Sequence, residues 1–340
     1  MMLTPTEFDS FTDAYVGVLR RILDDPDYET CGRGKDGIEV PNISFRLTDP
    51  TRRTPFLAAR KTNIVFNYAE LLWYVSGRDD VAMISYYAPR LAKLSADGTI
   101  LTGTAYGPRL FGLDGDDGLS QFDRCIRVLR QDPDSKRAAM VIMRPHEPIG
   151  PDNPDVACTL GLQFMLRGGR LHATGYMRGN DAVIGLLCDT FSFTMIQELA
   201  ARKLGVELGS YTHHVGSMHI NVLDRDKVTA ILTEADTTPA PQFPSPAIPG
   251  LNTAELELLM AWETALRTGT GELTAEAAAG LPLPDYWRQV LLLFDAYHQI
   301  QAGHRVNDDT ASALTAAHRW LLAQRWPGRI TAGEPAAQPS

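Results

Sequence analysis

Two short apolar-rich runs lie near the middle of the chain, at residues 159–166 and 170–177, and a Gly168-Gly169 pair joins them. Runs of this length around a two-residue glycine turn predict a β-hairpin. A long apolar segment from about 189 to 203 stops at Gly205, which predicts a helix with a glycine after its end. Polar side chains therefore gather at strand ends and at a helix start, where a rigid frame can aim them at a ligand.

The rest of the pattern predicts alternating helices and strands on both sides of this hairpin. An amphipathic first helix over residues 3–25 would place Phe8, Phe11, Tyr15 and Leu19 on one face. Residues 26–37 are predicted to form a glycine-rich loop, and residues 100–111 a second loop. The remaining predicted helices are 63–75, 79–95, 117–131, 253–268, 284–301 and 308–324, the remaining strands are 38–48 and 138–143, and 329–340 is predicted to be disordered.

Composition narrows the class of protein. The chain has 340 residues, 44% hydrophobic and 21% charged, which is ordinary for a globular protein. A net charge of −9 argues against a broad nucleic-acid surface, and no apolar run approaches the roughly 20 residues that cross a bilayer. No signal peptide is recognised, and the four cysteines lack zinc-type pairing, so the sequence predicts reduced thiols, no metal site and a cytoplasmic location.

One cysteine stands out by its position. Cys158 opens the first strand of the hairpin, and Arg178 ends the second. A lone cysteine is usually a small buried hydrophobe, but a nearby guanidinium favours a lowered pKa and a nucleophilic thiolate. Cys188 is the alternative nucleophile, although its apolar surroundings indicate a core position.

Several blocks around Cys158 together resemble the thymidylate synthase family, over about residues 30–225. In chain order they are Glu70-Leu71-Leu72-Trp73, Tyr106-Gly107, Lys136-Arg137, Cys158 with Gln163-Phe164, Arg178-Gly179-Asn180-Asp181 through Gly185 to Asp189, and His219-Ile220-Asn221. The resemblance implies an α+β fold, with a large mixed or antiparallel sheet packed with helices and extra C-terminal helices. It implies one catalytic domain over 1–330, with a helical part at about 250–325.

The resemblance also implies roles for individual residues. Cys158 would be the nucleophile, Tyr106 would lie close to its sulfur, and Glu70 would organise water and proton transfer. The bland alternative for Glu70 is a surface position on an amphipathic helix. The residues expected to bind a nucleotide are Arg33, Lys136, Arg137, Gln163, Arg178, Gly179, Asn180, Asp181, His219 and Asn221, with Lys35 as the alternative to Arg33 for the phosphate.

The implied co-substrate is 5,10-methylenetetrahydrofolate, with Lys61, Asp181 and Tyr86 as its expected contacts. The implied partner is a second copy of the chain, because the family's basic pair reaches across a two-fold interface to the neighbour's phosphate. Lys136 and Arg137 would fill that role here, the alternative being a solvated surface pair. The family's conserved closing tail is not recognisable, so the C-terminal helices would have to take its place.

Asp189 indicates the base. The family's methylating members carry asparagine there, which can donate to uracil O4 and accept from N3–H. An ionised carboxylate only accepts, so it would oppose O4 of uracil but accept from the N4 amino group of cytosine. The alternative is that Asp189 is only a helix N-cap before Thr190. The resemblance then points to the branch of deoxycytidylate and cytidylate hydroxymethylases, in which water captures the one-carbon unit.

Two smaller departures concern the sugar. Gly179 stands where the family has serine, and Lys136 where it has arginine. Both changes relax the surroundings of phosphate and sugar, as in the cytidylate hydroxymethylase branch of nucleoside-antibiotic biosynthesis, and Asn221 replaces the usual tyrosine. These positions favour CMP over dCMP. The alternatives are a dCMP hydroxymethylase, a thymidylate synthase acting on dUMP, and an idle nucleotide-binding dimer.

Overall fold

The central hairpin lies within an eight-stranded sheet in the computed structural model, which describes residues 4–32, 34–113, 117–147 and 153–334. The strand order is β1-β3-β8-β6-β5-β4, with β2 paired to β3 and β7 to β8. Parallel pairs (β1 with β3, β6 and β7 with β8) mix with antiparallel ones, so the expected mixed sheet is confirmed. The strands are β1 Thr6–Phe8, β2 Tyr28–Gly32, β3 Lys35–Leu47, β4 Ala139–Val141, β5 Thr159–Arg167, β6 Arg170–Met177, β7 Asn180–Asp181 and β8 Glu207–Asn221.

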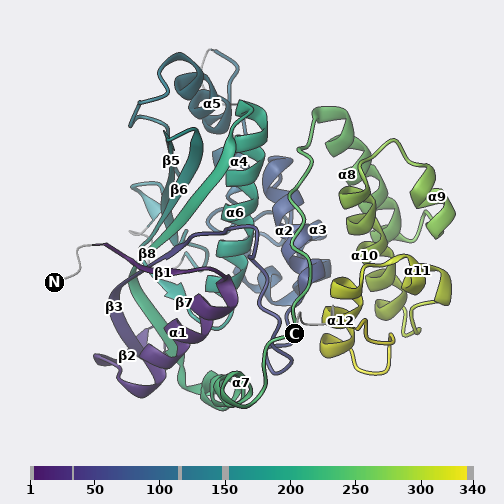
Figure 1. The fold of residues 1–340 in the computed structure, drawn as a ribbon, viewed down its shortest axis with the longest axis horizontal. Helices are drawn as coiled ribbons and strands as arrows, with labels where there is room; N and C mark the ends of the chain where they lie inside the picture. The colour runs from purple at the N-terminus through teal and green to yellow at the C-terminus, as the bar shows by residue number, and fades with distance from the viewer. Residues whose placement is uncertain (1–3, 33, 114–116, 148–152, 335–340) are drawn as a thin grey trace.

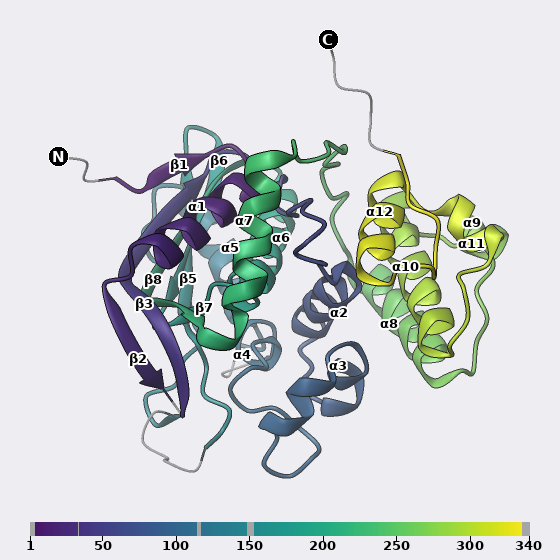
Figure 2. The same ribbon diagram turned by 90° about the horizontal axis from the view of Figure 1, so that it is seen from below.

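Helices cover one face of this sheet and continue beyond it as a separate group (Figures 1 and 2). The first group comprises α1 Phe11–Asp24, α2 Ile64–Val75, α3 Val81–Tyr87, η1 Pro89–Leu94, α4 Gly107–Leu110, α5 Gln121–Gln131, α6 Gly185–Leu204, η3 Val222–Asp224 and α7 Arg225–Thr237. The second comprises α8 Thr253–Thr268, α9 Ala275–Gly280, α10 Asp285–Gln301, α11 Asp308–Ala313 and α12 Ala316–Arg325. We call this second group, residues 253–325, the C-terminal helical segment.

The layers follow from where apolar side chains lie. Helix α6 is buried almost all round because it packs on β6 and β8 with one side and on α2 with another. Every residue of α2 is buried, since α10 and α12 cover the side that faces away from the sheet. The opposite face of the sheet leaves large apolar side chains exposed, namely Val141, Leu160 and Tyr176.

Several predicted elements need correction. The first helix starts at Phe11, because residues 6–8 pair with β3 as a strand. The predicted loop at 26–37 instead contributes a strand, since β2 (28–32) pairs antiparallel with β3 (35–47). Helix α6 begins at Gly185, four residues before Asp189. Strand β8 was not predicted. In the structure, buried and more exposed side chains alternate along much of it, as expected for a strand.

The last predicted helix is broken in two. Leu314 is extended with ψ 145°, and the hydroxyl of Thr315 accepts from the backbone N–H of His318 to start α12. A local capping bond therefore competes with continuation of the helix. No helix in the part of the chain that the structure describes is long and apolar enough to span a membrane.

Candidate active site

Cys158 and Arg178 meet at the start of β5 and the end of β6. The backbone N–H of Arg178 donates to the carbonyl of Cys158 at 2.9 Å, and its guanidinium Nη2 lies 3.6 Å from Cys158 Sγ. The same guanidinium donates to the carbonyls of Ala157 and Val156, which fixes its direction. Cys158 is partly exposed, whereas the rival Cys188 is buried, and burial raises the pKa of the Cys188 thiol far above its ordinary range, which disfavours its thiolate.

Tyr106 is buried near Cys158, and the loop before it is tied to the segment that leads to Cys158. The buried carboxylate of Asp155 accepts from the backbone N–H groups of Gly103 and Thr104 at 2.7 and 2.8 Å, which ties the loop to the segment just before Cys158. The ring of Tyr106 stacks on Tyr74, with centroids 5.2 Å apart. Burial raises the pKa of Tyr106 well above its usual range, and the nearby charges of Asp189, Cys158 and Glu70 add to that shift, so these groups lie close enough to interact electrostatically.

Glu70 is buried, so the surface alternative is wrong. Its side chain is 6% exposed, and its Oε2 accepts from the hydroxyl of Ser192 on α6 at 3.2 Å. Desolvation raises the pKa of Glu70 to about 7, although Ser192 and the more distant charge of Arg90 favour the ionised form. A carboxyl group poised near neutrality can both accept and release a proton.

Asp189 lies in the second turn of α6 and is not an N-cap, because the helix already starts at Gly185. Burial, and then the charge of Glu70, raise its pKa well above the usual range, while a hydrogen bond from Asn180 opposes this. The raised pKa favours the neutral form of Asp189, whereas the sequence argument assumed an ionised carboxylate. A neutral carboxyl group offers one donor and one acceptor.

Asn180 links Asp189 to a buried histidine. Its amide lies 3.3 Å from His213 Nε2, and His213 Nδ1 lies 2.7 Å from the hydroxyl of Tyr211. Burial lowers the pKa of His213 to about 3, so the ring is neutral. The chain of hydrogen bonds fixes Asn180, and through it the orientation of the Asp189 carboxyl group.

Asp181 is largely occupied by its own neighbourhood. Its Oδ1 accepts from the backbone N–H groups of Val183 and Ile184 at 2.8 and 2.9 Å, and its Oδ2 accepts from the side chain of Asn221 at 2.9 Å. These bonds shape the turn into α6. His219 is adjacent on β8, where it pairs in register with Asp181.

The basic residues predicted to bind the nucleotide phosphate lie at two separate places. Lys136 and Arg137 are exposed just before β4, at the open face of the sheet. Lys35 is exposed at the tip of the β2–β3 hairpin, and Arg33 lies outside the described residues. Gln163 bonds to the backbone of Lys136 and to Tyr176 on that open face, so the structure does not bring its side chain to the Cys158 group.

Gly179 is buried, and its backbone conformation is one that residues other than glycine can also adopt. A Cβ there would meet Ser217 at 3.5 Å, which is ordinary contact. The missing side chain therefore leaves usable space beside Arg178 rather than meeting a backbone requirement.

A pocket of about 280 Å³ opens next to Asp189. It is lined partly by Ile184, Leu187 and Cys188 from the first turn of α6, and by Asn67 from α2. Lys61 lies on this pocket as expected for a co-substrate contact. Tyr86 does not: its ring packs edge-on against Tyr297 of α10, and the neighbouring Tyr87 lines the pocket instead, because successive helical residues face different sides.

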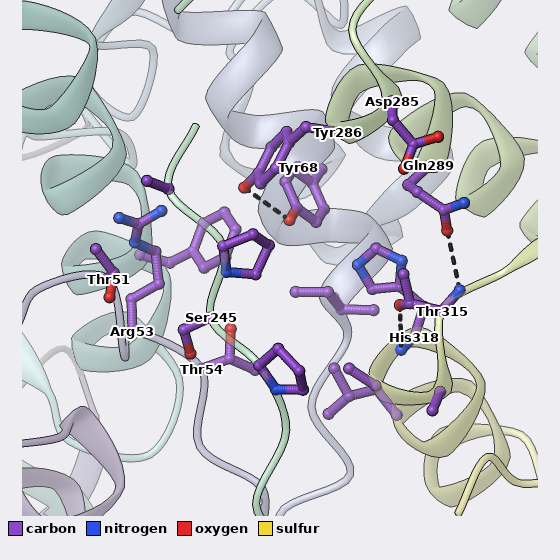
Figure 3. Close-up of a pocket in the computed structure, with 18 of the residues that line it drawn as sticks. Thr51, Arg53, Thr54, Tyr68, Ser245, Asp285, Tyr286, Gln289, Thr315 and His318 are labelled. Atoms are coloured by element: carbon purple, nitrogen blue, oxygen red, sulfur yellow. Dashed lines mark hydrogen bonds between the residues drawn. The ribbon is translucent and has the colours of Figure 1, made fainter. Parts of the chain in front are cut away.

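A larger cavity, about 540 Å³, lies between the C-terminal helical segment and the rest of the chain (Figure 3). It contains none of the predicted site residues. Helix α2 contributes Tyr68 to it, whose hydroxyl lies 3.0 Å from that of Tyr286. Size alone is therefore a poor guide here, since the reactive groups surround Cys158 and Asp189 instead.

Sequence reasoning missed several residues that build the site. None of them belongs to a recognisable motif: they are Asn67, Asp155, Ser192 and His213, together with Arg60, which lines the pocket beside Asp189. A polar residue within an otherwise apolar helix, such as Asn67 in α2, was the available signal.

Comparisons with known proteins identify a family and a shared fold. The profile of the family described as "Thymidylate synthase" matches residues 13–257. A "Deoxyuridylate hydroxymethyltransferase" of Bacillus phage SP01 is 32% identical over 67% of this chain and 63% of its own length, and one of Delftia phage PhiW-14 is 29% identical over 62% and 60%. The chain thus spans about three fifths of these relatives. A thermostable thymidylate synthase A from Bacillus subtilis shares the fold, with a TM-score of 0.56, 23% identity and coverage of 68% of this chain and 87% of that one.

Proposed function

The chain belongs to the thymidylate synthase family, and from that premise we propose that it transfers a hydroxymethyl group to C5 of a pyrimidine nucleotide. The observation that carries the proposal is the clustering of Asp189, Cys158 and Glu70 around Tyr106, close enough for their charges to act on its pKa, with the guanidinium of Arg178 3.6 Å from the sulfur. The relatives named as hydroxymethyltransferases support the same class of reaction.

Cys158 is the proposed nucleophile. C5 of a pyrimidine is a poor nucleophile until a thiolate adds to C6 and breaks the ring conjugation, which makes C5 enamine-like. The guanidinium of Arg178 stabilises the thiolate, and its remaining N–H groups are available to a nucleotide phosphate. Tyr106, rigid through its stacking on Tyr74, keeps one side of the sulfur dry.

The proposed co-substrate is 5,10-methylenetetrahydrofolate, which supplies a one-carbon electrophile. The pocket beside Asp189 suits a ligand of this kind, because its wall includes Cys188, next to Asp189 in the chain, and carries buried donors that lack partners, Arg60 Nε and Asn67 Nδ2. Hydroxymethylation requires water to add where a methylating enzyme adds hydride. Glu70 is the proposed proton carrier for that water, since its pKa of about 7 lets it act as base at neutral pH.

Cytosine is the preferred base in this proposal. Cytosine presents an N3 acceptor beside an N4–H donor, and the neutral carboxyl group of Asp189 presents a hydroxyl donor beside a carbonyl acceptor. The pair forms two hydrogen bonds without burying an unpaired charge. The absence of a side chain at Gly179, where a Cβ would make ordinary contact with Ser217, supports room for a ribose 2′-hydroxyl, so the proposed substrate is CMP ahead of dCMP.

A second candidate is uracil. A neutral Asp189 can also accept from uracil N3–H and donate to O4, and the phage relatives are named for deoxyuridylate. Hydroxymethylation of dUMP therefore remains the alternative substrate choice within the same reaction class.

A homodimer is the proposed assembly. The open sheet face exposes Val141 to 63% and Leu160 to 44%, which suits burial against a second copy. Lys136 and Arg137 stand at this face and would reach the neighbour's phosphate.

Mass analysis of products tests the proposal. The protein is incubated with methylenetetrahydrofolate and with CMP, dCMP, UMP or dUMP in separate tubes. The expected result is a hydroxymethyl adduct, largest on CMP. A hydroxymethyl adduct on dUMP alone would select the second candidate, a methyl adduct would overturn the water step, and no product in any tube would refute the reaction.

A further inference from the structure

The pocket beside Asp189 is surrounded by positive charge. Five of the residues that line it are cationic: Arg60, Lys61, Arg90, Lys227 and Arg325. No aspartate or glutamate is among its lining residues in the described part of the chain. None of the five takes part in the ion pairs formed within residues 4–32, 34–113, 117–147 and 153–334.

Two buried donors in the wall of the pocket lack acceptors. Arg60 is 6% exposed and Asn67 1% exposed, yet Arg60 Nε and Asn67 Nδ2 have no hydrogen-bond partner among the described residues. Buried donors of this kind are normally satisfied, so a missing acceptor indicates a ligand. Both atoms are donors, which means that the ligand must bring acceptors.

The cations also act on one another. Burial, and then the charge of Arg60, lower the pKa of Lys227 to about 8, with a smaller contribution from Arg325, while Asp224 and Asp181 oppose the shift. Burial, Arg60 and Arg90 likewise lower the pKa of Arg325. An anion in this pocket would relieve both repulsion and unmet hydrogen bonding.

The position of the pocket indicates which part of a ligand it would hold. Cys188 in its wall precedes Asp189, and Asn67 lies one helical turn before Glu70 on α2. Cys158 and Arg178 do not line it. The pocket is therefore distinct from the place where Arg178 can take a nucleotide phosphate, and it suits the acidic end of a second ligand that reaches the same base.

We propose that Arg325, together with Lys227, completes an anion site that binds the carboxylate-bearing tail of the one-carbon donor. The inference rests on the proposed function. Arg325 lies in α12, well beyond residue 257, where the match to the family profile ends. The C-terminal helical segment is thus part of the co-substrate site, because α12 packs on α2 and brings a cation to a pocket that the family region forms only in part (Figure 2).

The test measures binding without turnover. Titration calorimetry of the full chain is run with tetrahydrofolate carrying one or three glutamates, on the wild type, Arg325→Ala, Arg325→Lys and Arg305→Ala. Arg305 is an exposed arginine of the same segment outside the pocket, so it is the matched control. The expected result for Arg325→Ala is about tenfold weaker binding of the triglutamate form, a smaller loss for the monoglutamate form, and recovery in Arg325→Lys.

Three results would overturn the inference. The first is equal affinity of Arg325→Ala and Arg305→Ala for the triglutamate form, and the second is an equal loss of affinity for both tail lengths. The third is found by titrating inorganic tripolyphosphate in the same way: if only its binding depends on Arg325, the site belongs to a phosphate ligand. Turnover is scored separately with the product assay. If folate binding depends on Arg325 but no nucleotide product forms, the proposed reaction is refuted and the proposed anion site stands. If product forms but Arg325 has no effect on folate binding, the anion site is refuted and the proposed reaction stands.

Discussion

The guanidinium of Arg178 lies 3.6 Å from the sulfur of Cys158, while the backbone N–H of Arg178 donates to the Cys158 carbonyl. Two residues twenty positions apart are thereby held together by the pairing of β5 with β6. The hairpin register fixes where the sulfur and the cation meet, and Gly168 and Gly169, at φ 56° and 75°, make the tight turn possible.

Replacement of the sulfur tests the nucleophile. Cys158→Ser is expected to lower the rate of product formation by about 1,000-fold or more, because a serine hydroxyl beside Arg178 is not ionised at pH 7. Nucleotide binding, measured by calorimetry, should change little. Cys31→Ser, at an exposed cysteine outside the site, is the control. Full activity in Cys158→Ser would disprove the assignment.

Glu70 predicts a pH-dependent stability. Its pKa is about 7 in the folded chain against an ordinary value of 4.5, so the folded state holds its proton more tightly than the unfolded state. Stability linked to Glu70 is therefore full below pH 4.5 and is lost as pH rises to 7, by about 3 kcal/mol in total. Glu70→Gln should flatten this dependence in urea unfolding measured from pH 5 to 8.

The same variant reports on catalysis. Glu70→Gln should abolish the rise of kcat through pH 7 that an ionised base produces, and should lower hydroxymethyl product at pH 8. Glu257→Gln, an exposed glutamate on α8, should behave like the wild type in both assays. An unchanged pH profile in Glu70→Gln would remove Glu70 from the water step.

Asp189 predicts base selection. Asp189→Asn is expected to lower kcat/KM for CMP relative to dUMP by about tenfold, because the amide restores the pattern used for uracil in methylating relatives. Competition between CMP and dUMP in one tube, followed by mass analysis, measures the ratio directly. An unchanged ratio would show that another group reads the base.

The sugar preference is predicted to depend on Gly179 and Lys136. Gly179→Ser with Lys136→Arg should shift the ratio of CMP to dCMP turnover toward dCMP. The backbone tolerates the change, since a Cβ at Gly179 meets Ser217 only at 3.5 Å, and Lys136 is exposed. Retained thermal stability alongside an unmoved ratio would eliminate these positions as the basis for choosing ribose.

The shared-site dimer predicts complementation. Cys158→Ser and Arg137→Ala subunits should each be inactive alone, but a mixture that exchanges subunits should regain activity. One of the two sites in the mixed dimer then has an intact Cys158 and receives Arg137 from the other subunit. Adding Val141→Glu, which puts a charge on the open sheet face, should abolish the recovery. Arg137→Ala that is fully active alone would contradict the arrangement.

Some features of this protein were determined by the sequence by itself. The hairpin around Gly168-Gly169 and the helices 64–75 and 253–268 followed from local periodicity and turn chemistry, whereas the mixed sheet followed from the resemblance to a family. The positions of Cys158, Arg178, Glu70, Tyr106 and Asp189 were recognisable too, because each sits at an element end or within a distinctive block. These signals are local, so they survive without knowledge of the fold.

Only the tertiary structure decided the direction in which the pKa of Asp189 is shifted and the positive charge around the neighbouring pocket. The pKa of Asp189 depends on burial and on Glu70, which is more than a hundred residues away in the chain and reaches it only because α2 packs on α6. Arg60 and Arg325 likewise converge from opposite ends of the sequence. Desolvation and Coulomb interactions depend on distance in space, and no local pattern along the chain encodes that distance.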